Sequence, residues 1–194
     1  MSKPLVKILG SMVIVLLVYG CSGSVYKKMS VENPEKLLSM QDSLLLSRKN
    51  DQNILEALAS SHNSVADKYM KQNEYLSAIN HYENATRLDN SNITSKYGLL
   101  LAEGHSLLKK GNKNGIWDAI EKYSKASKLY PGNGEPFYWI AIAYTKLGDK
   151  DFDLIFESYE KALSLELDNG LMVEAEKKYK HAKERKKKLD SFWR

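Results

Sequence analysis

Residues 75–88 of this 194-residue chain read YLSAINHYENATRL, and this stretch decides the expected fold. Within it, Tyr75, Ala78, Tyr82, Ala85 and Leu88 follow one another at steps of 3, 4, 3 and 3 residues. Steps of three and four return to the same side of an α-helix. The stretch therefore predicts a helix with one buried face. On that face alanine lets a second helix approach closely, and the tyrosine ring fills the space beside the contact.

The same spacing occurs twice more, in IWDAIEKYSKASKL at residues 116–129 and in FDLIFESYEKALSL at residues 152–165. A small residue with an apolar residue three positions later precedes each of the three stretches: Ala66 and Tyr69, Gly104 and Leu107, Ala141 and Tyr144. This is an internal repeat, and repeats of this length are typical of helical solenoids.

The pattern resembles the tetratricopeptide repeat, a helix–turn–helix unit of 34 residues. Three copies fit near residues 59–92, 97–133 and 134–169. Corresponding residues lie 41 apart between the first two copies and 36 apart between the next two, and Ile155 replaces the small residue expected at its place. The resemblance implies an all-α solenoid, and the alternative is a helical bundle unrelated to that family.

Members of that family bind peptides or protein segments in a concave groove lined by the first helix of each pair. The resemblance therefore implies nine groove-facing candidates, three from each copy: Asn63, Asp67 and Lys71, then Leu101, His105 and Lys109, then Tyr138, Ile142 and Thr145. The full set of lysines and asparagines that clamps a terminal carboxylate in some family members is not evident. An extended or helical protein segment is the expected ligand.

Segments on both sides of the repeats complete the expected organisation. Residues 21–32 are small and polar and predict a tether, and residues 33–58 predict N-terminal helices, the first starting at Asn33 and Pro34 and the second near Asp51. Residues 59–169 hold the three repeats. Residues 170–194 predict a basic terminal helix that caps the last apolar surface of the solenoid.

The first 20 residues have the order of a secretory signal, with Lys3 and Lys7 ahead of a short apolar stretch. That stretch is about half of the ~20 residues that a spanning helix needs. Residues 17–21, LVYGC, resemble the lipobox of bacterial lipoproteins, in which the cysteine thiol receives a diacylglyceryl group and the freed amine is acylated, commonly with palmitate. Cys21 is the chain's only cysteine and is the predicted lipidation site. The alternatives are an uncleaved signal anchor, or a cleaved signal with an incidental cysteine.

Ser22 follows the cysteine, rather than the aspartate that marks inner-membrane retention in enteric bacteria. The expected location is therefore the cell envelope, lipid-anchored in the outer membrane and facing the periplasm.

Composition and motifs argue against several other functions. A single cysteine excludes an internal disulfide or a Cys-based metal site within one chain. The four histidines lie outside any metal or catalytic spacing, and no phosphate-binding glycine loop occurs. We therefore predict no catalytic residues, no metal, no cofactor and no enzymatic activity.

The net charge of +5 is localised. Residues 174–194 hold nine basic and four acidic residues, whereas residues 21–173 hold 18 basic and 20 acidic ones. The run Arg185, Lys186, Lys187 and Lys188 is a candidate patch for anionic lipid, lipopolysaccharide phosphates or an acidic partner. The alternative is a solvated helix face with cations near its C-terminus. Nucleic acid is not an expected partner, since an exported protein rarely meets it.

Two function hypotheses follow. The leading one is a lipid-anchored scaffold that binds envelope proteins or peptide segments through its groove and aids assembly of a secretion, pilus or cell-wall machine. The second is a structural envelope protein whose basic C-terminal helix binds anionic lipid or cell-wall polymer.

Overall fold

The computed structural model describes residues 25–148 and 150–192, and their secondary structure is helical apart from an isolated bridge between Asn133 and Glu166. A helical stretch over residues 25–32 comes first. The helices that follow are α2 (Pro34–Ser39), α3 (Gln41–Ser47), α4 (Gln52–Lys71), α5 (Tyr75–Leu88), α6 (Ile93–Lys110), α7 (Lys113–Leu129), α8 (Glu135–Leu147), α9 (Phe152–Leu163) and α10 (Asn169–Phe192).

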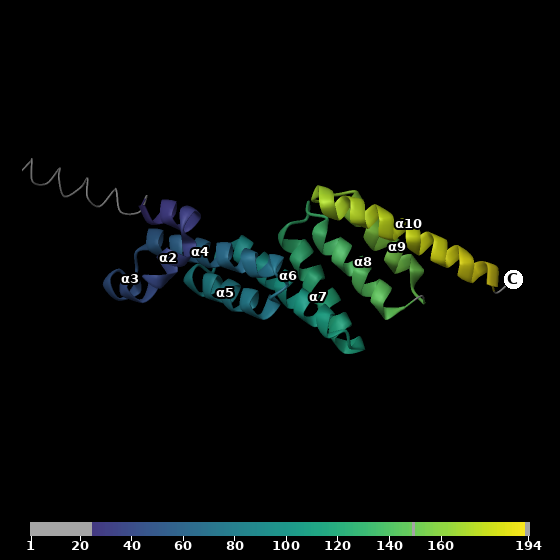
Figure 1. Ribbon diagram of the computed structural model, residues 1–194, viewed down its shortest axis with the longest axis horizontal. Helices are drawn as coiled ribbons and strands as arrows, with labels where there is room; N and C mark the ends of the chain where they lie inside the picture. Colours follow the sequence, from purple (N-terminus) through teal and green to yellow (C-terminus); the bar gives the residue numbers. More distant parts are fainter. Residues whose placement is uncertain (1–24, 149, 193–194) are drawn as a thin grey trace, which may run out of the picture.

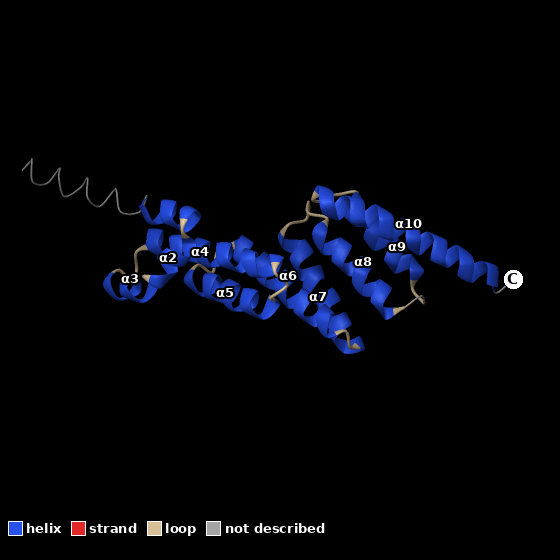
Figure 2. Cartoon of the chain, viewed as in Figure 1, coloured by secondary structure: helices blue, strands red, loops and turns tan. Residues whose placement is uncertain are grey.

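These helices follow one another along the long axis of the molecule, with α2 and α3 at one end and α10 at the other (Figures 1 and 2). From α4 to α10 each helix packs against the next one in the chain. The buried apolar side chains accordingly form several clusters along the row instead of one central core. The fold class is therefore all-α, as the sequence predicts.

Polar caps and turn residues set the helix ends. The Asp51 carboxylate accepts the backbone N–H of Asn53 at 3.1 Å and starts α4 at the predicted place. The Asn92 and Asn112 side chains cap α6 and α7 in the same way. Between α4 and α5, Asn73 takes a positive φ of 60°, which asparagine tolerates better than most residues.

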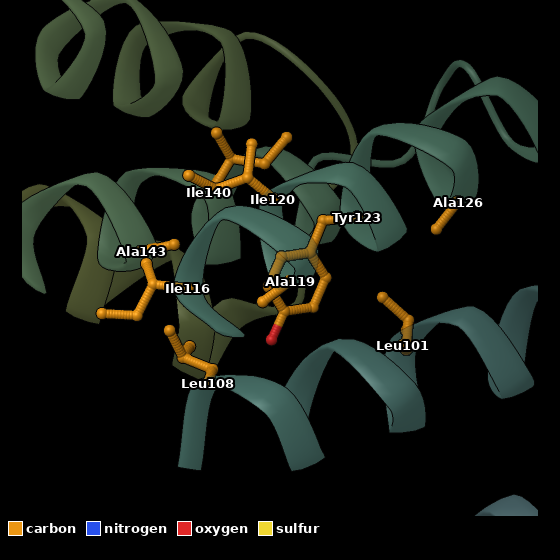
Figure 3. Close-up of a cluster of buried hydrophobic side chains, with 9 residues drawn as sticks. All are labelled: Leu101, Leu108, Ile116, Ala119, Ile120, Tyr123, Ala126, Ile140 and Ala143. Carbon is orange, nitrogen blue, oxygen red and sulfur yellow. The ribbon is translucent and has the colours of Figure 1, made fainter. Parts of the chain in front are cut away.

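The alanines of the three spaced stretches, and Tyr82, Tyr123 and Tyr159 beside them, are buried. Tyr123 of α7 is fully buried and points with Ala119 toward α6, which carries Leu101 and Leu108 (Figure 3). Gly104 of α6 faces the Tyr123 ring so closely that a Cβ there would lie 2.5 Å from a ring carbon. Small or apolar residues of the three stretches, and two alanines that precede them, are inaccessible to solvent: Ala66, Ala78, Ala85, Ala119, Ala126, Ala141, Ile155 and Ala162.

The N-terminal part differs from the prediction in two ways. The expected tether is wrong over residues 25–32, which are helical, because Tyr26 and Met29 pack against the apolar cluster of α2, α3 and α4. The helix expected to start at Pro34 is broken at Met40 into α2 and α3, and each of the two helices buries one leucine, Leu37 or Leu44, in that cluster. The predicted signal segment, Cys21 and Ser22 lie outside the described residues.

Candidate functional site

The nine groove candidates lie on the first helix of each pair, α4, α6 and α8, but they do not share one environment. The side chains of Leu101 and Tyr138 are 5% and 1% exposed and belong to the apolar core. The expectation that these two residues line an open surface is therefore wrong. Lys71 is exposed, whereas the Asn63 side-chain oxygen is buried and accepts no hydrogen bond from the described residues.

Other candidates hold the buried tyrosines. The Tyr82 hydroxyl donates to the Asp67 carboxylate, and the Tyr123 hydroxyl lies 2.7 Å from His105 Nδ1. Burial raises the pKa of Tyr159 to about 12, and a hydrogen bond with Thr145 opposes that shift. A buried tyrosine needs a partner for its hydroxyl. Asp67, His105 and Thr145 thus have an internal role that the sequence prediction missed.

Three of the candidates, His105, Lys109 and Ile142, meet in one open hollow of about 290 Å³, which we call the inner hollow. It lies between the α4–α5 turn, α6 and α8. Its lining residues are Asn73, Tyr75, His105, Leu108, Lys109, Trp139, Ile142 and Lys146.

Aromatic rings form one side of the inner hollow. The centroid of the Trp139 ring lies 4.3 Å from that of His105, and the Tyr75 ring lies 5.2 Å from His105. Trp139 is fixed in place by Glu135, whose Oε1 accepts the indole N–H at 3.3 Å. Burial lowers the pKa of His105 to about 4, so this ring is neutral at neutral pH.

Two exposed lysines supply the charge of the inner hollow. Lys109 Nζ lies 3.4 Å from the Asn73 carbonyl oxygen and 5.6 Å from the centroid of the Tyr75 ring. Lys146 comes from the last turn of α8. Among the described residues, no carboxylate lines this hollow and no acidic residue forms an ion pair with either lysine. The arrangement suits an anionic group that is accompanied by apolar surface.

The sequence prediction placed the exposed face of α8 one residue away from its position in the structure. Trp139, Ile142 and Lys146 line the hollow at steps of three and four residues, whereas the prediction chose Tyr138, Ile142 and Thr145. Trp139, Ile142 and Lys146 follow helical spacing in the sequence too, so spacing alone did not exclude them. The two sets differ in which large ring of α8 is buried in the core. In the structure that ring is Tyr138.

Two residues of the basic run on α10 already make contacts within the chain. The Arg185 guanidinium lies 5.5 Å from the centroid of the Phe152 ring, and Lys186 Nζ lies 3.7 Å from an Asp190 carboxylate oxygen. Lys187 and Lys188 are exposed. Ala175 and Ala182 are the buried residues of α10. This helix packs on α9, where the sequence predicts a terminal helix.

A second polar cluster, which the sequence did not predict, joins α3, α4 and α5. His62 Nδ1 lies 2.9 Å from His81 Nδ1, and His62 Nε2 lies 2.8 Å from Gln41 Oε1. Burial, together with the neighbouring His81 and Arg87, lowers the pKa of His62 to about 4. Burial also lowers the pKa of His81. No sequence signal links these residues, because 19 and 21 positions separate the bonded pairs.

Comparison with known proteins adds no further assignment. No protein-family model matches the chain, and no curated protein matches it either. Within residues 25–148 and 150–192, none of the helices has both the length and the apolar character needed to cross a membrane. The same residues contain no group of three or more His, Cys, Asp and Glu side chains that are placed to hold a metal ion. The structure defines an all-helical protein whose consecutive helices pack in chain order.

Proposed function

We propose that this protein is a lipid-anchored scaffold of the bacterial cell envelope, built as a tetratricopeptide-repeat solenoid that binds a protein segment. Three helix pairs, α4–α5, α6–α7 and α8–α9, match the three proposed copies. Apart from Tyr75, the alanines and tyrosines of the three spaced stretches are buried. In this assignment α10 is the capping helix, and α2 and α3 cover the other end of the row.

The inner hollow is the observation that carries the proposed binding function. Its residues come from the α4–α5 turn, from Tyr75 at the start of α5, and from the first helices of two successive pairs, α6 and α8. These first helices line the groove in the family that the sequence resembles. An open hollow with aromatic rings and lysines suits an extended or helical polypeptide better than a small enclosed cofactor.

Affinity capture from cells, with mass spectrometry of the captured proteins, tests this proposal. Ile142→Arg places a long cation in the inner hollow and is expected to abolish capture of a specific envelope protein. Ile93→Arg makes the same chemical change at the half-exposed start of α6 and serves as the matched control. Circular dichroism melts must show that both variants fold. Equal capture by the two folded variants would overturn binding at this site.

The membrane anchor is tested separately. Cys21→Ser is expected to prevent incorporation of labelled palmitate and to leave an unprocessed precursor. Two or more acyl chains anchor a protein firmly, whereas one binds only marginally. Palmitate labelling of the Cys21→Ser protein at the level of the unaltered one would contradict the proposed anchor.

One observation favours a second function, direct binding of anionic lipid by α10. Lys183, Lys186 and Lys187 line a hollow of about 450 Å³ beside Phe156, and Phe192 near the helix end is 79% exposed. Replacing Lys187 and Lys188 with alanine is expected to weaken binding to vesicles rich in phosphatidylglycerol and to leave protein capture unchanged. Unaltered vesicle binding by that variant would remove this alternative.

A further inference from the structure

We propose that the inner hollow binds an acidic side chain of a partner polypeptide, with an apolar or aromatic side chain of the same segment against Tyr75 and Trp139. This inference rests on the proposed function and names the class of segment that the groove takes.

The charge of the hollow selects an anion. Lys109 and Lys146 are the charged residues of its lining, and His105 between them is neutral. Elsewhere in the described chain, two lysines form ion pairs with a carboxylate on another helix. Lys68 of α4 pairs with Glu35 of α2, and Lys122 Nζ lies 2.7 Å from Glu103 Oε2. No carboxylate of the described residues pairs with Lys109 or Lys146, so a ligand carboxylate can take that place.

Lys109 is already directed toward such a ligand. Its ammonium group is held by neutral partners, the Asn73 carbonyl oxygen at 3.4 Å and the face of the Tyr75 ring. A side chain that is ordered before binding loses less conformational entropy when the ligand arrives. The contacts therefore place a positive charge at the rim of the hollow while leaving it accessible.

The size and surroundings of the hollow favour a polypeptide over a free ion. A volume of about 290 Å³ lies at the lower end of the range for small-molecule pockets and suits one or two side chains. A second hollow of about 550 Å³ shares Asn73, Tyr75 and Lys109 with it and continues past Glu74 and Lys110. A ligand that fills both must be elongated, and the rings of Tyr75 and Trp139 offer it apolar surface beside each charge.

The test uses a short peptide of alternating Glu and Phe, acetylated and amidated at its ends, and the same peptide with Gln in place of each Glu. Binding is followed by the fluorescence of Trp139 in full-length protein that carries Trp117→Phe and Trp193→Phe. We expect the Glu peptide to bind, to change the Trp139 emission and to lose affinity as salt rises. We expect Lys109→Ala with Lys146→Ala to weaken its affinity by about tenfold.

The matched control removes two positive charges elsewhere. Lys113→Ala with Lys128→Ala changes two exposed lysines of α7 that line neither hollow, and it is expected to leave the affinity unchanged. Equal binding of the Glu and Gln peptides, or an equal loss in both double variants, would overturn the inference. Binding only by a peptide with a free C-terminus would also overturn it, in favour of a terminal carboxylate.

The outcomes for the inference and for the proposed function are distinguishable. If Ile142→Arg abolishes capture of the cellular partner while the double variant at Lys109 and Lys146 still captures it, the groove functions and the acidic-segment inference is wrong. If both variants lose the partner and the Glu peptide competes for it, both proposals are supported.

Discussion

Acidification is expected to destabilise this fold through two buried histidines. The side chains of His62 and His105 are 5% and 7% exposed, and burial lowers the pKa of each from 6.5 to about 4. The folded protein therefore keeps both rings neutral at a pH where the unfolded chain protonates them. His81, which bonds to His62, has a pKa shifted in the same direction.

The sign and size follow from proton linkage. Between about pH 6.5 and pH 4 the unfolded chain binds more protons than the folded one, so the free energy of unfolding rises with pH across this window. Each group contributes about 1.4 kcal/mol per pH unit, which amounts to about 3 kcal/mol over the window. The stabilisation is complete above the unfolded pKa and is lost as the pH falls toward 4. Two such groups together approach the total stability of many domains, about 5–15 kcal/mol.

Urea titrations followed by far-UV circular dichroism, repeated across this pH range, measure the effect. His62→Gln is expected to remove about 1.4 kcal/mol per pH unit from the dependence of the unfolding free energy on pH. Because carboxylates also titrate in this range, the comparison between variant and unaltered protein carries the result. His181→Gln, which removes an exposed histidine of α10, is the matched control.

A pH dependence that is the same in His62→Gln, in His105→Gln and in the unaltered protein would contradict a role for these two histidines. It would mean that these two rings take up protons in the folded state without cost.

Three further predictions concern buried residues. Gly104→Ala places a methyl group against the Tyr123 ring and is expected to destabilise the fold by about 1–3 kcal/mol in denaturant titrations. A loss below that range would show that the ring moves aside freely. Tyr123→Phe removes the hydroxyl that meets His105 and should cost about 1–3 kcal/mol, because a buried ring nitrogen loses its partner. An unchanged melting temperature would contradict that bond. Ala175→Gln forces a longer polar side chain between α10 and α9 and should increase protease cleavage within α10. Unaltered cleavage would argue against packing of α10 at this position.

The helical order of the repeats could be predicted because it depends on local spacing. The three stretches with steps of 3, 4, 3 and 3 correspond to α5, α7 and α9. A cap or turn residue precedes each of these helices. The alanines and tyrosines at these steps predict which face of each helix is buried, since charged residues lie on its other faces. The start of α4 was predictable for the same reason, because Asp51 caps its own helix.

Features that depend on contacts between distant segments could not be predicted in this way. The bonds of His62 to His81 and Gln41 form only after α3, α4 and α5 have packed. The choice between Tyr138 and Trp139 as the buried ring on α8 depends on the space that α9 and α10 leave. Helix formation over residues 25–32 depends on the apolar cluster that Tyr26 and Met29 join.

We propose that the inner hollow holds a protein partner in the cell. Incorporation of a photoreactive amino acid at Lys146, followed by irradiation of intact cells and mass spectrometry of the adducts, tests it most directly. We expect a specific envelope protein to be crosslinked from position 146 and to be lost in Ile142→Arg, with no such adduct from the exposed position 128 on α7. No adduct from position 146, or the same adducts from both positions, would contradict it.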